Sequence, residues 1–254
     1  MKYQSTTPKP GPEFVPLLSP FAQNNNISGF AGFANMPERY FRRAADYVPR
    51  NKRRTFYRLA KRGLDISISI SVLVMALPLI AAIAALIKLT SSGPVFFRHK
   101  RLGKHGVEFD CLKFRTMVSD AQEILNKNEE LRRQFDEKFK IENDPRITRI
   151  GSFLRRTSLD ELPQLIQVLQ GKMTLIGPRP IVRDEVEKYS IYANKLLRIK
   201  PGLSGLWQTS GRSETTYEER VLLDMRYIDN RCLILDLHLL VLTVGVVLTK
   251  SGAC

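Results

Sequence analysis

Residues 66–87 read ISISISVLVMALPLIAAIAALI, a run of 22 residues without a single charge. Built as a straight helix with a rise of roughly 1.5 Å per residue, the run would extend about 33 Å, which is close to the thickness of a bilayer core. The alternative is a helix buried inside a soluble domain, but such helices seldom stay uncharged over this length. We therefore predict that residues 58–92 form a membrane helix that anchors the chain.

Pro78 lies near the middle of this run, twelve residues after Ile66 and nine before Ile87. A proline inside a helix removes one backbone hydrogen bond and bends or breaks the helix. Both flanks of the run are basic, and the positive-inside rule places basic flanks in the cytoplasm, which a straight span satisfies at one end only. We predict a re-entrant helix broken at Pro78 with both ends in the cytoplasm, and a straight span is the alternative. The basic flanking residues are Arg53, Arg54, Arg58, Lys61 and Arg62 before the run, and Lys88, Arg98, Lys100, Arg101 and Lys104 after it.

The composition indicates a polyanionic partner. The 254 residues carry a formal net charge of +15, which suits nucleic acid, anionic lipid or a phosphorylated substrate. Residues 1–57 are predicted to be a flexible basic tail, and its basic cluster beside an apolar run is typical of binding to anionic headgroups. Cys111, Cys232 and Cys254 show no metal-site spacing, so we expect reduced thiols in a cytoplasmic protein.

Residues 93–254 are predicted to form one mixed, helix-rich α/β catalytic domain. The apolar segment 237–249 is too short to span a bilayer, so we expect a C-terminal helix that lies in the interface or covers the core. The other expected elements are strands at 95–97 and 109–114 around a basic loop, and helices at 119–140, 159–169, 182–197 and 216–227.

Two acids stand side by side in residues 157–165, which read TSLDELPQL. Ser158 followed by Glu161 is a capping-box pattern, which predicts a helix from Leu159 with Asp160 and Glu161 at its positive end. Adjacent helical residues point roughly 100° apart, so one carboxylate could attack an electrophile while the other holds a metal ion. The alternative is that both acids only cap the helix.

Missing motifs narrow the chemistry. The chain has no P-loop, no dinucleotide-binding glycine motif after a strand, and no nucleophile elbow, and its three histidines are scattered. What remains is a carboxylate pair among arginines, whose planar forks bind phosphate. Magnesium and arginine can offset the charge of an attacking carboxylate, so the set fits phosphoryl transfer through an aspartyl phosphate. Arg179, held between two prolines, suits recognition, although an ordinary turn is the alternative.

Six motifs in one order carry a resemblance to a known family. From about Arg58 to Cys254 the chain resembles the bacterial sugar transferases, the monotopic phosphoglycosyl transferases. The matching segments are KRGLD (61–65), KFRTM (113–117), NDPRIT (143–148), SLDELPQ (158–164), IGPRP (176–180) and PGLSGLWQ (201–208).

The resemblance implies transfer of a hexose 1-phosphate from a UDP-sugar to undecaprenyl phosphate, with release of UMP, as the first membrane step of exopolysaccharide synthesis. It implies that Asp160 is the nucleophile and that Glu161 helps to bind Mg²⁺, or Mn²⁺. Galactose or glucose is the expected sugar, the expected location is the cytoplasmic face of the bacterial inner membrane, and homo-oligomerisation is left open. The predicted substrate-binding residues are Arg155, Arg179, Lys113, Arg115, Arg146 and Gln208.

Two other classes of protein remain as rivals. A basic nucleic-acid-binding protein with an apolar dimerisation helix would need a binding module or aromatic residues interleaved with its basic cluster, and the sequence shows neither. We therefore expect no nucleic-acid partner. A non-catalytic membrane scaffold would not need the acidic pair, so it would keep working after Asp160→Asn.

Overall fold

The computed structural model describes residues 50–138, 141, 144–210 and 215–249. Most of the predicted tail, residues 1–49, lies outside this part of the chain. The first described helix, α3, begins at Arg50, so the last residues of the predicted tail are helical.

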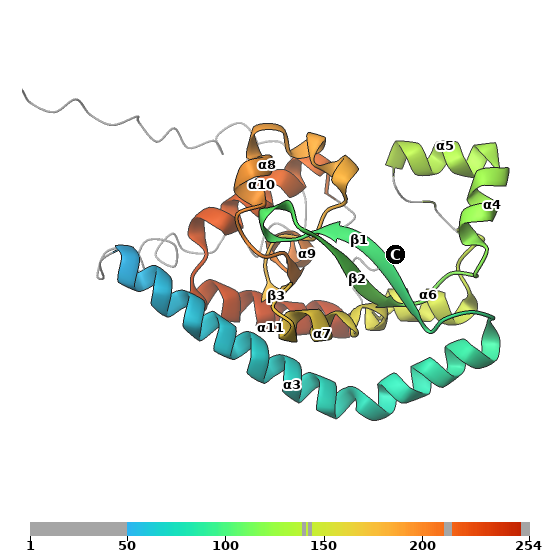
Figure 1. Ribbon diagram of the computed structural model, residues 1–254, viewed down its shortest axis with the longest axis horizontal. Helices are drawn as coiled ribbons and strands as arrows, with labels where there is room; N and C mark the ends of the chain where they lie inside the picture. Colours follow the sequence, from blue (N-terminus) through green and yellow to red (C-terminus); the bar gives the residue numbers. More distant parts are fainter. Residues whose placement is uncertain (1–49, 139–140, 142–143, 211–214, 250–254) are drawn as a thin grey trace, which may run out of the picture. The chain divides into compact units, whose positions relative to one another are not determined.

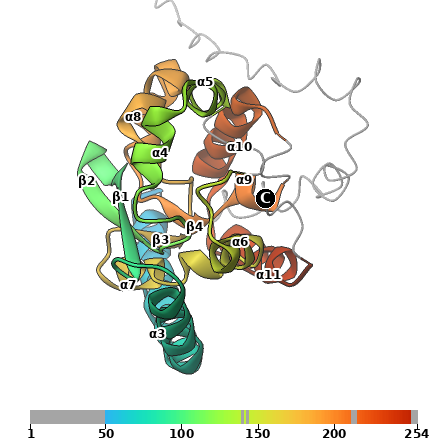
Figure 2. The same cartoon turned by 90° about the vertical axis from the view of Figure 1, so that its right-hand side faces the viewer.

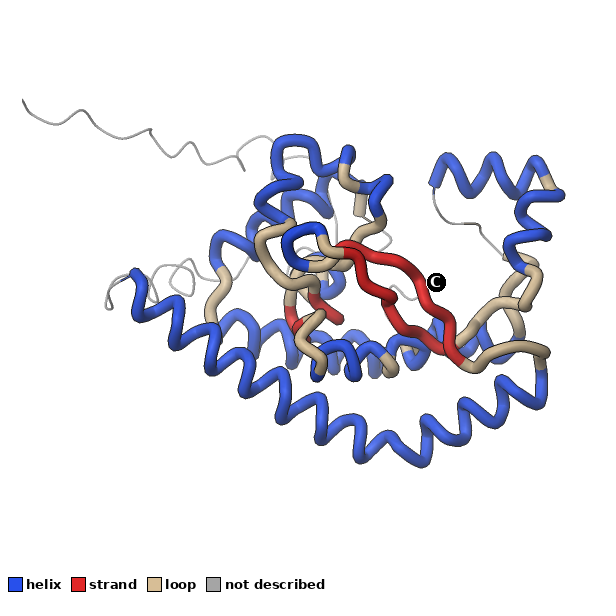
Figure 3. Tube along the Cα trace, viewed as in Figure 1, coloured by secondary structure: helices blue, strands red, loops and turns tan. Residues whose placement is uncertain are grey.

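Helices make up most of the described chain, and strands form only a hairpin and one short parallel pair (Figure 3). The expected mixed, helix-rich class is therefore confirmed. In chain order the elements are α3 Arg50–Thr90, β1 Phe96–Leu102, η1 Lys104–Gly106, β2 Glu108–Phe114, α4 Ala121–Lys127, α5 Glu129–Lys138, α6 Arg149–Arg156, η2 Leu159–Glu161, α7 Gln164–Leu169, β3 Thr174–Ile176, η3 Arg183–Glu185, η4 Glu187–Tyr192, α8 Ala193–Leu196, β4 Gly202–Ser204, α9 Leu206–Thr209, α10 Tyr217–Asn230 and α11 Leu233–Thr249.

Helix α3 carries the apolar run and presents most of it to the outside. It is the one described helix long and apolar enough to cross a membrane, and only 11% of its most apolar stretch is buried. Met75 is 82% exposed and Leu77 is 58% exposed, which contradicts the alternative of a buried soluble helix. The predicted break is absent, because α3 continues through Pro78, but Figure 1 shows that the helix bends along its length.

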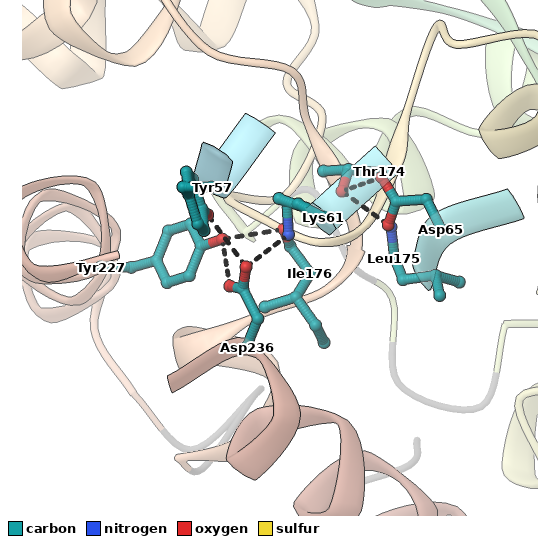
Figure 4. Close-up of polar contacts among 8 residues, drawn as sticks. All are labelled: Tyr57, Lys61, Asp65, Thr174, Leu175, Ile176, Tyr227 and Asp236. Carbon is teal, nitrogen blue, oxygen red and sulfur yellow. Dashed lines mark hydrogen bonds and ion pairs between the residues drawn. The ribbon is translucent and has the colours of Figure 1, made fainter. Parts of the chain in front are cut away.

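The start of the apolar run is tied to the downstream domain by a buried polar network (Figure 4). Asp236 of α11 accepts hydrogen bonds from Lys61 Nζ and from the Tyr57 hydroxyl, each at 2.9 Å. The hydroxyl of Tyr227 lies 2.7 Å from the other carboxylate oxygen of Asp236 and 2.9 Å from the carbonyl of Ile176. The carboxylate of Asp236 therefore joins α11 to α3 and α10, and the hydroxyl of Tyr227 extends the network to β3.

Two further charged residues of the KRGLD motif (61–65), to which Lys61 belongs, bond this end of α3 to the domain. Arg62 donates to two carbonyls at the C-terminal end of α7, at 2.6 and 2.7 Å, where the helix dipole favours a cation. Asp65 is buried and accepts from the hydroxyl of Thr174 and the amide of Leu175 at the start of β3. We call Lys61, Arg62 and Asp65 the anchor clamp.

The far end of α3 is held by the same domain. Arg115, which directly follows β2, donates to the carbonyls of Ser91 and Ser92 at 2.9 and 2.6 Å. These carbonyls come just after the C-terminal end of α3, where a cation is favoured. Both ends of the apolar helix are therefore bonded to one domain.

An apolar cluster lies between α3 and that domain. Ile83 and Ile87 of α3 pack with Phe114 of β2 and Leu154 of α6, and Leu159 and Leu162 are among the partly buried residues around them. Figures 1 and 2 both show α6, α7 and α11 lying between α3 and helices α8 and α10. The turn that carries the two acids is therefore seated on the apolar helix.

Close backbone contact brings two of the sequence motifs together. Strands β3 and β4 pair in parallel, and a Cβ atom at Gly202 would lie 2.1 Å from the amide nitrogen of Gly177. A Cβ at Gly205 would lie 2.1 Å from the carbonyl oxygen of Gly177. Only glycine permits this approach, and it places Arg179 beside Trp207, each two residues further along the chain.

Several predicted helices differ from the structure. The segment 119–140 contains two helices, α4 and α5, because Asn128 between them is extended, and α4 begins only after Asp120. The segment 182–197 is three short pieces, interrupted at Ser190, whose φ is 44°. By contrast, the predicted helix at 216–227 is confirmed as α10, with a capping box between Thr216 and Glu219.

The predicted C-terminal apolar helix is present as α11 and starts four residues earlier than expected, at Leu233. Leu235 and Leu239 face the core, while apolar residues at spacings of three and four form an exposed stripe along the helix. The exposed residues of this stripe are Ile234, Leu237, Val241 and Val244.

We expect Gly151→Ala to lower the free energy of unfolding by about 1–3 kcal/mol, because the new Cβ would lie 1.9 Å from the carbonyl oxygen of Thr116 and would push α6 away. Gly63→Ala is the matched control, since nothing lies within 4 Å of a Cβ there and alanine favours a helix by roughly 0.5–1 kcal/mol. Thermal unfolding in detergent would test both. Equal stability of the two variants would contradict the packing described here.

Candidate active site

Asp160 and Glu161 lie in the short 3₁₀ turn η2 rather than in the first turn of an α-helix. The predicted capping box is wrong: Ser158 has a left-handed φ of 56° and its side chain makes no capping bond. Pro163 explains the difference, because it has no N–H to donate to the carbonyl of Leu159, as an α-helix would require. The amides of Glu161 and Leu162 instead bond three residues back, and α7 begins only at Gln164.

Lys113 joins the two carboxylates. Its Nζ lies 2.6 Å from Glu161 Oε1 and 3.6 Å from Asp160 Oδ2. Asp160 is only 7% exposed, and this burial is the main reason that its pKa is raised. The positive charge of Lys113 opposes the shift, and the negative charge of Glu161 adds to it. Asp160 is thus a buried carboxylate whose ionised form depends on the cations around it.

Two of the predicted arginines approach the acidic pair. Arg179 Nη1 lies 3.8 Å from Glu161 Oε1. Arg155 is held by a hydrogen bond from its Nε to the hydroxyl of Thr116 at 2.9 Å, and its charge favours the ionised form of Asp160. Lys113, Arg155 and Arg179 therefore surround the two acids from β2, α6 and the loop after β3.

The other predicted residues lie in different settings. Arg115 bonds the end of α3, and Arg146 forms a buried bidentate ion pair with Asp144 at 2.7 and 2.8 Å. Gln208 is buried on α9. A role for these three residues in substrate binding stays a prediction.

Sequence reasoning missed a second group of residues next to Arg179, which we call the arginine–tryptophan cluster. The guanidinium of Arg220 lies 4.9 Å from the ring centroid of Trp207 and 5.0 Å from that of Tyr217. The guanidinium of Arg179, which approaches Glu161, also lies 5.7 Å from the ring centroid of Trp207. Glu185 and Arg101 complete the cluster. One signal was available: Arg220 and Asp224 fall four residues apart on the buried face of α10.

The donor set around the two acids fits a hard cation that also binds a phosphate. The described residues contain no group of three or more His, Cys, Asp or Glu that could hold a metal ion by themselves. Magnesium is usually bound by one or two carboxylates together with substrate phosphates, and Asp160 and Glu161 supply that number. A metal here would compete with Lys113 for the carboxylate of Glu161.

The sequence matches the family model for the bacterial sugar transferases over residues 56–250, and the chain belongs to this family. It is 47% identical over 201 residues to the undecaprenyl-phosphate galactose phosphotransferase of Salmonella typhimurium, a match that covers 77% of this chain and 42% of that protein. It is 41% identical to the exopolysaccharide production protein ExoY of Rhizobium meliloti, covering 77% of this chain and 88% of ExoY. It is 40% identical to the UDP-glucose:undecaprenyl-phosphate glucose-1-phosphate transferase of Escherichia coli, covering 74% of this chain and 40% of that protein. The chain thus spans less than half the length of the first and third relatives.

Asp160→Asn is expected to raise the stability of the protein, and Asp144→Asn to lower it. The raised pKa of Asp160 means that the folded state holds the carboxyl proton more tightly than the unfolded state. The stability of the wild-type protein therefore falls as the pH rises from the pKa of the unfolded state to that of the folded state. The asparagine variant avoids this loss, so its advantage should grow with pH above about 4.

Asp144 is the matched control with the opposite sign. Burial pushes the pKa of Asp144 up, but the hydrogen bonds and charge of Arg146 outweigh it and leave the pKa lowered. This carboxylate stabilises the fold above its unfolded pKa, and the contribution is lost as pH falls through the folded pKa. Asp144→Asn also breaks the buried ion pair with Arg146, at a cost of about 3–5 kcal/mol near neutral pH. Chemical unfolding at several pH values would measure both variants, and a destabilised Asp160→Asn protein would contradict the assignment.

Proposed function

We propose that the protein is a phosphoglycosyl transferase that moves a hexose 1-phosphate from a UDP-sugar to undecaprenyl phosphate and releases UMP. The observation that carries the proposal is the buried Asp160, paired with Lys113 and seated on the apolar helix α3. Family membership supports it, and so do relatives whose names specify galactose and glucose transfer to undecaprenyl phosphate. UDP-galactose or UDP-glucose is therefore the expected donor, and exopolysaccharide synthesis is the expected pathway.

The chemistry needs two displacements at the same phosphorus. In the first, a carboxylate oxygen of Asp160 bonds to the β-phosphorus of the UDP-sugar, and the bond from that phosphorus to the bridging oxygen breaks, so that UMP leaves with the electron pair. In the second, an oxygen of undecaprenyl phosphate attacks the same phosphorus and frees the Asp160 carboxylate. Arg179, Lys113 and Arg155 are the cations placed to offset the negative charge that gathers in both steps.

Magnesium is proposed as the cofactor, with Mn²⁺ as a substitute. Glu161 is the residue on which we place it, since its carboxylate lies beside Asp160 and within reach of Lys113 and Arg179. When bound, the cation would neutralise the diphosphate that the arginines only partly offset. The oxygen ligands of this site suit Mg²⁺ or Mn²⁺ rather than Zn²⁺.

We further propose that α3 is re-entrant, with both ends on the cytoplasmic face of the inner membrane. The clamp residue Asp65 is bonded to β3, and Ser91 at the far end is bonded to Arg115, next to β2. Gln167 of α7 links these strands: its side chain bonds Leu112 and Asp110 of β2, and its carbonyl accepts from the amide of Met173, directly before β3. A helix that crossed the bilayer would place Asp65 and Ser91 on opposite sides of the membrane. A single water-exposed domain could not then bond both residues.

The exposed apolar stripe of α11 supports contact between this domain and the membrane. Apolar residues on one face and a core-packed opposite face are the pattern of a helix that lies in the interface. Phe153 of α6 and Ile166 of α7 are also exposed, at 49% and 40%. We propose that these three helices rest on the headgroup layer, with anionic lipid as the partner of the basic flanks.

Purified protein given UDP-galactose or UDP-glucose without lipid acceptor should gain the mass of a hexose phosphate on Asp160. Asp160→Asn should abolish the adduct and cut transfer by at least about a thousandfold, because the nucleophile is gone. Intact-mass analysis with peptide mapping would show the adduct, and EDTA should suppress it until Mg²⁺ is restored. Transfer that requires both substrates together, with no adduct, would contradict the two-step proposal.

Single cysteines at Thr55 and Leu89, in a background without the three native cysteines, should test the topology of α3. Both positions are exposed and flank the apolar run. In intact cells both should be protected from a membrane-impermeant thiol reagent and should react after lysis. Reaction of Thr55→Cys in intact cells, with Leu89→Cys protected, would mean a true span. Pro78→Leu should straighten α3 and move the result toward that outcome.

A further inference from the structure

The arginine–tryptophan cluster contains buried polar atoms that nothing in the described chain satisfies. Arg220 is only 7% exposed, yet its Nε and Nη2 atoms have no hydrogen-bond partner among the described residues. The same holds for Glu185 Oε2 and the hydroxyl of Tyr217. Leaving such groups unpaired is costly, so folded proteins rarely do it without a ligand or ordered water at the site.

The charges of the cluster converge on one oxygen without closing a hydrogen bond. Glu185 Oε2 lies 3.6 Å from Arg220 Nη2 and 3.9 Å from Arg101 Nη1, both beyond hydrogen-bond distance. Burial alone would favour a tighter ion pair, because two charges in a low-dielectric site attract strongly. The spacing leaves donors available to a further polar group.

The cluster is continuous with the acidic pair. Arg179 lies 3.8 Å from Glu161 on one side and 5.7 Å from the Trp207 ring on the other. If Asp160 attacks one phosphorus of a bound molecule, a second phosphate of that molecule could contact Arg179, and a ring beyond it could stack on Trp207. Trp207 is half-buried, and its Nε1 is fixed by a hydrogen bond to Thr215 at 2.7 Å, which holds the indole in one orientation.

We propose that the arginine–tryptophan cluster binds the pyrimidine nucleotide half of the donor, with the uracil against Trp207 and its carbonyl oxygens on Arg220. This inference rests on the proposed function. The cluster has an excess of donors, because Arg101 and Arg220 approach the same oxygen of Glu185, a third arginine, Arg179, lies on Trp207, and the hydroxyl of Tyr217 has no partner among the described residues. A nucleotide offers an excess of acceptors in its carbonyls and phosphate, whereas the hydroxyls of a hexose offer donors and acceptors alike. Aromatic and guanidinium faces also suit a planar base better than a hexose.

The chain provides its own probe, because Trp207 is its only tryptophan. In the full-length protein in detergent, UMP should quench the tryptophan fluorescence in a saturable way, and hexose 1-phosphate should not. Arg220→Lys keeps the charge but loses the planar fork, and it should weaken UMP binding by about tenfold or more. Tyr217→Phe removes only one hydroxyl and should weaken it by about threefold, which keeps the test open if the lysine variant folds poorly. Arg183→Lys is the matched control, since Arg183 pairs with Glu108 at the surface, two residues from Glu185.

Transfer activity measured on the same preparations separates the two proposals. Wild-type protein that neither transfers sugar phosphate nor binds UMP would refute the proposed function and this inference with it. Active wild-type protein whose UMP affinity is unchanged in both cluster variants would overturn only the inference. Loss of hexose 1-phosphate binding in place of UMP binding would make the cluster a sugar pocket and would equally overturn it.

Discussion

The structure depends on the packing of the acidic turn against the apolar helix. Ile83 and Ile87 of α3 form a buried cluster with Phe114 and Leu154, and the leucines on either side of the two acids pack around it. Each fully buried Ile or Leu contributes roughly 1.5–3 kcal/mol, so this contact is a substantial part of what holds the turn in place. It also fixes the position of Asp160, because this residue cannot move away from α3 without opening the core.

The same seating creates the electrostatic character of the site. Burial raises the pKa of Asp160, and Lys113 keeps a positive charge close enough to offset part of that effect. An ionised carboxylate at low solvent exposure is poorly hydrated, and its nearest cation is an ammonium group already shared with Glu161. A phosphate that brings its own metal ion would release Lys113 from this pairing. The site is thus an ion-paired state in which Lys113 and Arg179 already lie within 4 Å of a carboxylate.

Much of this arrangement follows from sequence, and the failures have physical causes. The apolar run, two neighbouring strands and the capped helix α10 depend on local patterns, and the structure contains them. The basic loop expected between the strands was wrong, because β1 continues to Leu102 and pairs with β2 over that length. The capping box at Ser158 failed because Pro163 withholds a single hydrogen bond, which outweighs a favourable cap. Local sequence patterns could not predict that Arg115 bonds the end of α3, since its partners lie 23 and 24 positions away in the chain. The arginine–tryptophan cluster was missed for the same reason, because it joins β1, η3, α9 and α10.

The bend in α3 and the two sets of polar contacts at its ends depend on one another. The anchor clamp and Arg115 hold points of the helix that are separated by the whole apolar run, and both sets of partners belong to one domain. A straight helix could meet both only by lying along the domain surface, where its exposed apolar side chains would face water or lipid along their full length. A bend directs the middle of the helix away from the domain while its ends stay bonded. Pro78 lowers the free energy needed for a bend in α3, since proline has no N–H to donate to the carbonyl four residues earlier.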